Sequence, residues 1–280
     1  MVTTEKELSP EAKQHLSIFK RALPMQVKLH EIIRSLDNTE KLVCLDIGAD
    51  NAMMSYYLRK RGGEWHSAVC GQREADATNA VVGGNVYVMD GKTLPFKKGF
   101  FDVLIVFDYL ERVESDDNFI EECHRVLKPD GRLIVNVAHV RPWMVLRTLQ
   151  QMMGLTCEKK GLVRDGYSES QLFSILKHGF DVHNMRSYSR FFVELTDTVV
   201  QFFKARAKES DPGNEKKVKA VYSIAFLPYR IGYQFDMLLF FTRGYNLIAV
   251  AKRRAWRPRN TPVLVDGRSI SEAVLHKALD

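Results

Sequence analysis

One short stretch near the start of the chain constrains the fold more than any other. Residues 43–52, Val-Cys-Leu-Asp-Ile-Gly-Ala-Asp-Asn-Ala, pass from an apolar run through an acid and a glycine into a helical pattern that reaches Leu58. This order is typical of a buried parallel strand that turns sharply into a helix at a nucleotide-binding site. Gly48 would let the backbone approach a ligand that a side chain would push away. The first amides of the following helix would offer hydrogen-bond donors to that ligand.

The acid in this stretch argues against one class of ligand. The G-x-G-x-x-G pattern is absent, and Asp46 would repel a pyrophosphate, so a dinucleotide is not favoured. A ligand with cationic groups would be attracted instead, and S-adenosylmethionine carries both a sulfonium and an ammonium. A single Asp-x-Gly is a weak signal, so the rest of the chain has to decide.

Strand and helix patterns alternate from Leu42 onward, which predicts a parallel sheet with right-handed crossovers. We expect strands at 42–46, 65–70, 85–89, 101–107, 132–137, 180–188 and 246–252, and helices at 52–60, 74–81, 119–127 and 168–178. The predicted fold class is therefore α/β, with a doubly wound, Rossmann-like sheet of seven strands.

The last two predicted strands should pair as a hairpin, yet many more residues separate them than a hairpin loop contains. Apolar residues recur at helical spacing over 189–208, a polar turn follows, and 218–241 returns. This pattern predicts a helical insertion in the form of an αα-hairpin. Pro228 is expected to kink or split its second helix.

The chain is thus expected to divide into four parts. These are an N-terminal helical segment (1–40), a core (41–189 plus 245–253), the insertion (190–244) and a C-terminal tail (254–280) that ends in a short capped helix. For the N-terminal segment we favour packing onto the sheet over a cap above the ligand cleft.

Composition narrows the environment of the protein. The net charge of +7 favours an anionic partner, which could be nucleic acid, an anionic membrane surface or an acidic metabolite. The four cysteines are scattered, which predicts thiols in a reducing compartment and neither disulfides nor a zinc site. The polar start does not read as a signal peptide, so a cytoplasmic protein is expected. Residues 235–251 form the longest apolar stretch, but Asp236 and Arg243 interrupt it, so it should not span a bilayer.

Four segments in order and spacing resemble the class I S-adenosylmethionine-dependent methyltransferases. They are Leu45-Asp46-Ile47-Gly48-Ala49, the acid-to-Leu-Pro-Phe run at 90–96, the strand and Leu-Glu-Arg-Val segment at 101–113, and Arg-Val-Leu-Lys-Pro-Asp-Gly-Arg-Leu at 125–133. The chain is most similar to the type 11 branch, which acts on small molecules and lipids. The resemblance covers about residues 42–189 and 245–253, and it implies S-adenosyl-L-methionine as the cofactor.

The resemblance also implies a set of cofactor-binding residues. They are Asp46, Gly48, Ala49, Asp50, Gln72, Met89, Asp90, Gly91 and Phe107, with Asp90 expected to meet the adenine amine. Two positions depart from the family pattern. Asp50 stands where the family usually has glycine, and Gln72 lies where a strand-end acid usually binds the ribose, with no acid before Glu74. Gln72 could bond to the ribose, Asp50 could take over, or cofactor affinity could be weak or lost.

Methyl transfer from a sulfonium is an in-line displacement, so the protein mainly has to align two reactants. A base is needed only if the acceptor must lose a proton. Side chains at the carboxyl ends of the fourth and fifth strands are the candidates, with Asp108 and His139 as catalytic residues and Tyr109 and Arg141 as acceptor-binding residues. Each of these residues also has an alternative role. Asp108 could cap a helix or bind the cofactor, His139 could be purely structural, and Arg141 could be a solvated surface residue. No pattern indicates a metal site.

The sequence therefore predicts an S-adenosylmethionine-dependent methyltransferase that modifies oxygen or carbon of a small or lipid-like acceptor. One rival is a non-catalytic binding protein of the same fold, motivated by the altered second strand. Another is an RNA methyltransferase, motivated by charge and weakened because no RNA-binding module is recognisable, so a nucleic-acid partner is not expected.

The insertion suggests where the acceptor comes from. We expect residues 190–243 to form a lid that takes an apolar acceptor from an anionic membrane surface, which would place the protein peripherally at the inner face of the membrane. Basic and aromatic residues that stand close by in sequence are Lys204, Arg206, Tyr229, Arg230, Tyr233 and Trp256. The alternatives are a homodimer contact and plain packing onto the core.

Overall fold

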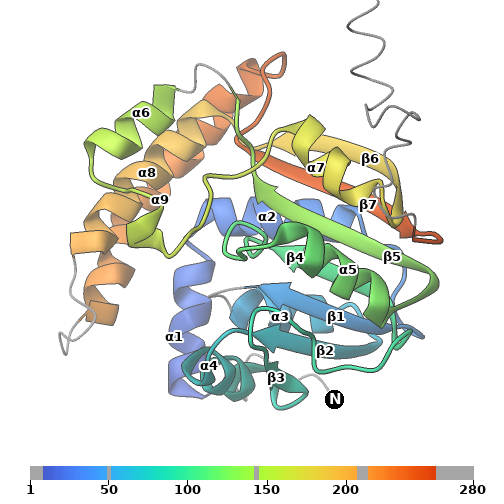
Figure 1. Ribbon diagram of the computed structural model, residues 1–280. Helices are drawn as coiled ribbons and strands as arrows, with labels where there is room; N and C mark the ends of the chain where they lie inside the picture. Colours follow the sequence, from blue (N-terminus) through green and yellow to red (C-terminus); the bar gives the residue numbers. More distant parts are fainter. Residues whose placement is uncertain (1–8, 49–51, 142–144, 207–213, 257–280) are drawn as a thin grey trace, which may run out of the picture.

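The computed structural model describes residues 9–48, 52–141, 145–206 and 214–256 (Figure 1). The strands are β1 (Val43–Gly48), β2 (Glu64–Val69), β3 (Val86–Val88), β4 (Phe101–Phe107), β5 (Leu127–Ala138), β6 (Phe180–Tyr188) and β7 (Asn246–Arg253). They form a seven-stranded sheet in the order β3-β2-β1-β4-β5-β7-β6. Only β7 in this sheet is antiparallel to its neighbours, β5 and β6. The predicted fold class and the terminal hairpin of strands are confirmed.

The central strands form because their apolar runs are covered on both faces, as parallel strands require. The side chains of 44–48 and 103–107 are buried throughout. Gly48 of β1 pairs with Phe107 of β4, and Phe107 pairs in turn with Asn136 of β5. The carboxyl ends of β1, β4 and β5 therefore lie level at one edge of the sheet.

Helices cover both faces of the sheet (Figure 1). On one face lie α5 (Asp116–Val126) and α7 (Glu169–Leu176), which contribute Phe119 and Leu172 to a continuous apolar core. On the other face lie α3 (Ala52–Arg59) and the N-terminal helices α1 (Pro10–Phe19) and α2 (Leu23–Arg34), with Ile32 and Met53 fully enclosed. The remaining crossover helix is α4 (Gln72–Val82).

Three elements differ from the sequence-based expectations. The helix α6 (Val145–Met152) and a short 3-10 turn at Glu158–Lys160 were not expected, although the apolar residues of α6 recur at helical spacing. Strand β5 begins at Leu127, five residues before the predicted start at residue 132, and so includes the Lys-Pro-Asp-Gly segment. Asp130 has a φ of 62°, so the turn geometry is present as an irregularity within the strand.

The insertion consists of two long helices, α8 (Phe191–Arg206) and α9 (Asn214–Leu238), which pack against each other as the αα-hairpin that the sequence predicts. Pro228 lies inside α9, which continues through it, so of the two expected outcomes the split does not occur. Tyr222 and Tyr229, on either side of the proline, are fully buried against α8, and this packing holds the helix together. Asp236 near the end of α9 accepts hydrogen bonds from the Phe192 and Val193 amides at the start of α8.

The hairpin packs on the N-terminal helices. Ala22 joins Val193, Val200, Tyr222 and Tyr229 in a small apolar cluster of its own, and α1 and α2 contact α9 and α8 respectively. The two segments that lie outside the family resemblance are therefore associated with each other at the carboxyl edge of the sheet. Within the described ranges, no helix has both the length and the hydropathy needed to cross a membrane. The four-part division of the chain stays a prediction.

Candidate functional site

The last residue of β1 lies in close contact with β4. A Cβ atom on Gly48 would lie 2.1 Å from Cε2 of the Phe107 ring, far inside van der Waals contact. Phe107 is buried, so the ring cannot simply swing into solvent. Glycine is therefore required here by a side chain of the protein itself, in addition to any ligand. Ala49 and Asp50 lie outside the described residues.

Asp46 does not face the strand ends. Its carboxylate is buried between β1, β2 and α3, where Oδ1 accepts a hydrogen bond from Ser55 Oγ (2.6 Å) and Oδ2 accepts one from Ser67 Oγ (2.8 Å). Burial raises the pKa of Asp46, and the Ser55 hydrogen bond and the charge of Arg59 act in the opposite direction. The carboxylate thus ties the first strand to its neighbour and to the helix that follows it.

At the end of β2, the residue that we predicted to meet the ribose is bonded within its own helix. Gln72 is exposed at the start of α4, and its Nε2 donates to Asp76 Oδ1 (2.8 Å). The side chain of Glu74 folds back towards the end of β2. Its Oε2 lies only 2.2 Å from the position that a Cβ atom on Gly71 would occupy. Glu74 is therefore a carboxylate that the turn after β2 brings close to the position of the missing acid.

The loop after β3 carries the predicted adenine-binding residues. Asp90 is exposed, and its Oδ1 accepts hydrogen bonds from the amides of Lys92 (2.8 Å) and Thr93 (2.7 Å). These bonds lower the pKa of Asp90 and fold the loop into a tight turn. Met89 is buried directly before it, and Gly91 has a φ of 80°, which favours glycine.

Tyr109 lies on this same side of the site. Its ring is buried against Phe119, and its hydroxyl accepts a hydrogen bond from the Cys70 thiol (3.2 Å). A Cβ on Gly91 would lie 3.4 Å from the same hydroxyl. The structure therefore brings Tyr109 together with the loops after β2 and β3, which the family resemblance associates with the cofactor.

Asp108 stands at the end of β4 with a φ of 52°, in the left-handed region that is uncommon for residues other than glycine. Its Oδ1 accepts from Asn136 Nδ2 (3.1 Å) and its Oδ2 from the Lys28 ammonium. Asn136 Oδ1 accepts in turn from the Tyr188 hydroxyl. Lys28 comes from α2, so the N-terminal segment both packs on the sheet, as we favoured, and supplies a charged group to the strand ends.

A cavity of about 910 Å³ opens beside this ion pair, between the ends of β4 and β5 and the helices α2, α6 and α8. Its lining combines aliphatic side chains with many charged ones. The charged residues are Lys28, Asp108, Glu111, Arg112, Arg147, Glu158, Lys160, Asp165, Glu194, Asp197 and Lys204, and the aliphatic ones include Leu146, Leu155 and Leu162. Such a cavity is large enough for a small organic molecule.

Two carboxylates that line this cavity, Glu111 and Glu194, were not predicted as site residues from the sequence. Glu111 is buried, and burial together with the negative charge of Asp108 raises its pKa to about 7. Glu194 of α8 accepts hydrogen bonds from Ser189 Oγ (2.6 Å) and Asn246 Nδ2 (2.8 Å), and burial next to Asp197 raises its pKa to about 7. Glu111 stands in the Leu-Glu-Arg-Val segment that carries the family resemblance, so this segment offered a signal for it. Glu194 offered none beyond its place in an apolar helix.

His139 and Arg141 lie on the β5 side of the cavity. His139 lines it and is buried, with Nδ1 placed 2.8 Å from the carbonyl oxygen of Gly244, and burial lowers its pKa. If the ring is neutral with its proton on Nδ1, Nε2 is left as an acceptor. The Arg141 guanidinium lies 5.7 Å from the centre of the Tyr245 ring, and Tyr245 lines the cavity.

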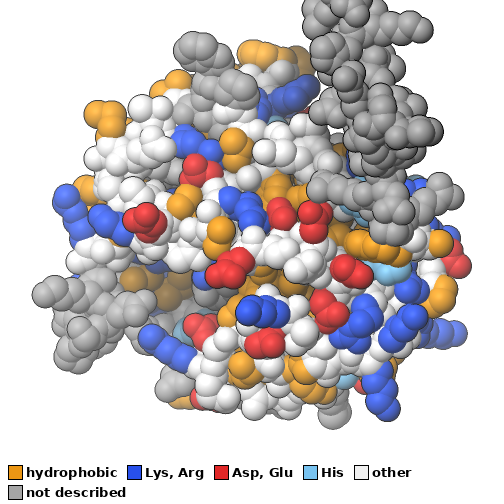
Figure 2. All heavy atoms as spheres, in the orientation of Figure 1, with side chains coloured by type: hydrophobic (Ala, Val, Ile, Leu, Met, Phe, Trp, Pro, Cys, Tyr) orange, Lys and Arg blue, Asp and Glu red, His pale blue; other side chains and the backbone are white. Residues whose placement is uncertain are grey.

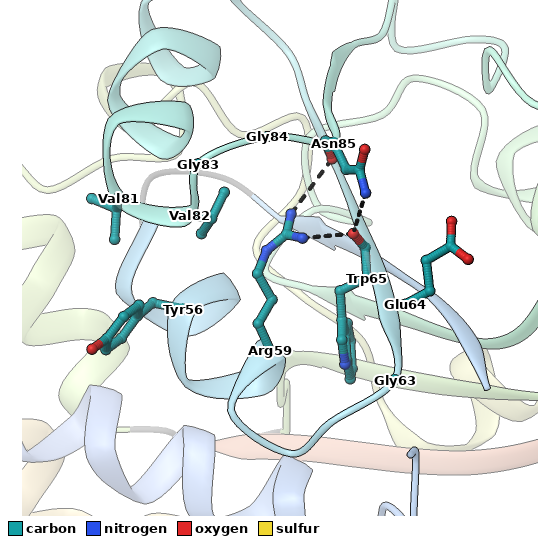
Figure 3. Close-up of a pocket in the computed structure, with 10 residues that line it drawn as sticks. All are labelled: Tyr56, Arg59, Gly63, Glu64, Trp65, Val81, Val82, Gly83, Gly84 and Asn85. Atoms are coloured by element: carbon teal, nitrogen blue, oxygen red, sulfur yellow. Dashed lines mark hydrogen bonds between the residues drawn. The ribbon is translucent and has the colours of Figure 1, made fainter. Parts of the chain in front are cut away.

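A second, smaller pocket of about 400 Å³ lies at the opposite edge of the sheet (Figure 3). It is formed where β2 and β3 begin, and Arg59 crosses it to donate to the Trp65 carbonyl (2.6 Å) and to Ser67 Oγ (2.9 Å). Ligands of open α/β sheets bind at the carboxyl ends of the strands. We therefore assign this pocket a structural role around Arg59.

Comparison with known proteins agrees with this arrangement. A family model described as "Methyltransferase domain" matches residues 45–135, from β1 to β5. Together with the strand order, this match supports the resemblance to the class I S-adenosylmethionine-dependent methyltransferases of the type 11 branch that the sequence shows.

Individual relatives of this methyltransferase domain are distant. A ubiquinone/menaquinone biosynthesis C-methyltransferase of a Ruegeria species is 31% identical over 100 residues, which cover 32% of this chain and 40% of that protein. A proposed methyltransferase from Bacillus halodurans aligns in structure with a TM-score of 0.54 and 13% identity, over 80% of this chain and 97% of that chain. A geranyl diphosphate C-methyltransferase from Streptomyces coelicolor, solved with S-adenosyl-L-homocysteine, has a TM-score of 0.52 and 15% identity over 82% and 76%.

The similarity to these relatives covers only part of their length or only the fold. The chain spans well under half the length of the curated relatives that it matches. At 13–15% identity, the solved structures show the shared fold alone.

Proposed function

We propose that this chain is an enzyme that transfers a methyl group from S-adenosylmethionine to a small or lipid-like acceptor. The observation that carries the proposal is the cavity at the end of β4 and β5, next to the glycine turn that the methyltransferase family uses for its cofactor. A cofactor bound over β1 would present its methyl group towards this cavity, and the sulfonium supplies an activated methyl group and a neutral leaving group.

The chain's own residues suit this cofactor on the β1–β3 side. The turn at Gly48, the buried Met89 and Phe107, and the loop of Asp90 and Gly91 lie at level strand ends. We assign Asp46 a positioning role, because both carboxylate oxygens are bonded to serine hydroxyls of the protein. Glu74 supports ribose binding better than Gln72 does, since its carboxylate lies over Gly71.

On the acceptor side, the cavity favours a molecule with both a polar and an apolar part. We assign Asp108 a positioning role, because Lys28 and Asn136 bond both of its oxygens and thereby fix the end of β4. His139 stays a candidate for contact with the acceptor through Nε2. The names of the two C-methyltransferase relatives support carbon as one target atom, while the cavity itself suits oxygen equally well.

The test is transfer of a labelled methyl group. The full chain is incubated with S-[methyl-³H]adenosylmethionine and a bacterial lipid and metabolite extract, and the label is followed into the organic and aqueous fractions. Label in a small or lipid product, lost in the Gly48→Val variant, supports the proposal. Cofactor binding without transfer to any fraction supports the rival non-catalytic protein, and label in RNA supports the rival RNA methyltransferase.

The outer face of the hairpin supports a membrane source for the acceptor. Five exposed apolar residues, Ile224, Leu227, Ile231, Phe235 and Leu238, recur at helical spacing along α9, and Phe240 and Phe241 follow beyond its end. Figure 2 shows hydrophobic side chains with Lys or Arg beside them at the end of the molecule where α9 leads into β7. Apolar and basic side chains together are typical of helices that lie in the interface of anionic bilayers.

Two of the residues that we associated with this surface from the sequence are not on it. Tyr229 is fully buried and donates a hydrogen bond to Asp197 Oδ1 (2.7 Å), and Trp256 packs against His124 with ring centres 5.0 Å apart. The proposed membrane surface therefore consists of the exposed α9 residues and the basic residues Arg206, Arg230 and Arg243.

We expect the protein to float with anionic vesicles and to be released by salt, because basic residues contribute to the binding. The double change Ile224→Ser and Leu227→Ser should lower the bound fraction several-fold. The matched control is Val163→Ser, an exposed apolar residue elsewhere on the molecule, which should leave binding unchanged. A protein that ignores vesicles and forms a stable dimer split by the double change would contradict the membrane proposal and make this face a homodimer contact.

A further inference from the structure

Only one of the two carboxylate oxygens of Glu111 has a hydrogen-bond partner among the residues that the structure describes. The residue follows β4, and its side chain crosses to the end of β5, where Oε1 accepts a hydrogen bond from the Ala138 amide (2.6 Å). The residue is 3% exposed and lines the large cavity. Its other oxygen, Oε2, is buried without a hydrogen-bond partner among the residues that the structure describes. A buried carboxylate oxygen without a partner carries a desolvation cost, which a ligand donor would relieve.

Several charged groups surround this carboxylate. Lys28 of α2 and Asp108 at the end of β4 act on it directly, and Arg112 and Glu194 line the same cavity. Burial and the charge of Asp108 raise the pKa of Glu111 to about 7, while Lys28 acts in the opposite direction. Glu111 therefore changes its charge near neutral pH, which is the range in which a general base is most useful.

The other candidates for a base are less well placed. Both oxygens of Asp108 are bonded, one of them to the Lys28 ammonium, so its proton affinity is reduced by the opposite charge. His139 is fixed through Nδ1 at the Gly244 carbonyl. The Nε2 atom of His139 remains as an acceptor, but burial lowers the pKa of this residue and so makes it a weaker base. Among these three residues, Glu111 alone has a buried carboxylate oxygen without a hydrogen-bond partner among the described residues.

We propose that Glu111 Oε2 accepts the proton of an acidic hydroxyl on the acceptor, which makes it a phenol or an enol. This inference rests on the proposed methyl transfer and names its base and the class of acceptor. The hydroxyl proton passes to Glu111, the electron pair left on the acceptor forms a bond to the methyl carbon, and the carbon–sulfur bond breaks so that its electrons stay on sulfur. The attacking atom is the oxygen itself or the conjugated carbon that shares its charge.

The class of acceptor follows from the basicity. A carboxylate with a pKa near 7 shares or removes a proton efficiently only when the acceptor's own pKa is not far above it. Phenols and enols meet this condition, whereas aliphatic alcohols and alkyl C–H groups are far less acidic. The aliphatic lining of the cavity, Leu146, Leu155 and Leu162, suits the apolar body of such a molecule.

The Glu111→Gln variant tests this assignment without knowledge of the natural acceptor. Its amide oxygen still accepts from Ala138, so the amide nitrogen has to take the place of Oε2 and turns an acceptor into a donor. The probes are 1-naphthol and 1-methoxynaphthalene, which lacks the hydroxyl proton, and their binding is measured by fluorescence on the full chain saturated with S-adenosylhomocysteine. At pH 8 we expect the wild type to prefer 1-naphthol roughly tenfold.

This preference should fall as the pH drops through about 7, because protonated Glu111 is a weaker acceptor and can itself donate to the ether oxygen of 1-methoxynaphthalene. It should disappear in Glu111→Gln, and the control Glu158→Gln, an exposed acid of the same cavity, should keep it. Equal affinities of the wild type for the two probes, no binding of either, or an unchanged preference in Glu111→Gln would overturn the inference. Failure of S-adenosylhomocysteine to bind, measured first by calorimetry, would instead overturn the proposed function.

Discussion

Replacing Gly48 with valine is expected to abolish measurable S-adenosylhomocysteine binding and to destabilise the protein by about 3 kcal/mol. The added Cβ would lie 2.1 Å from the ring of Phe107, which is enclosed by the core. Either the ring or the turn after β1 has to move, and both would disturb the surface on which the cofactor is proposed to lie. Calorimetry and urea denaturation measure the two effects.

A second substitution tests whether the contact with Phe107 is the cause of this destabilisation. In the double variant Gly48→Ala with Phe107→Leu, the smaller side chain leaves room for the Cβ, so stability should recover relative to Gly48→Ala alone. Phe107→Leu by itself serves as the control. Additive effects of the two changes would show that the ring contact is not the reason for glycine at this position.

The pH dependence of stability should change strongly when Glu194 is replaced by glutamine. The pKa of Glu194 is raised to about 7 in the folded protein, mainly by burial, from an ordinary value of 4.5. A raised folded-state pKa stabilises the protein below the unfolded pKa, and this contribution is lost as the pH rises through about 7. Between pH 5 and pH 8, Glu194 should therefore lower the free energy of unfolding by about 2 kcal/mol.

Glutamine keeps the oxygen that accepts from Ser189 and Asn246, so Glu194→Gln should lack this loss while the fold is retained. Urea denaturation of both proteins at pH 5 and pH 8 gives the comparison, with Glu158→Gln as a control from the same cavity. The same difference between wild type and variant at both pH values would contradict a raised pKa.

The alternating strands and helices of the core were predictable from the sequence. The spacing of apolar residues in a strand (every second residue) or a helix (every 3.6 residues) depends only on residues that are near in sequence. Strands β4 and β6 match their predicted ranges, and the insertion was recognisable because a hairpin of strands does not need so long a connection. Helix α6 was missed although its apolar residues recur at helical spacing, so a signal for it was present in the sequence.

The site was less predictable, because its important contacts join residues that are distant in sequence. Lys28 and Asp108 pair across 80 positions, and nothing in the N-terminal pattern marks this lysine. Asp46 was predicted to bind the cofactor, and its hydrogen bonds with Ser55 and Ser67 join residues 9 and 21 positions apart, which no local pattern marks. Burial of Glu111 depends on helices that come later in the chain, so its raised pKa has no local signature.

Calorimetric titration of the full chain with S-adenosylhomocysteine tests the central claim most directly. The account predicts one site per chain with a dissociation constant on the order of 10 μM or tighter, and no measurable binding in the Gly48→Val variant. The departures at Asp50 and Gln72 would then be compatible with a working cofactor site. No binding by a folded wild-type protein at roughly millimolar ligand would contradict the account.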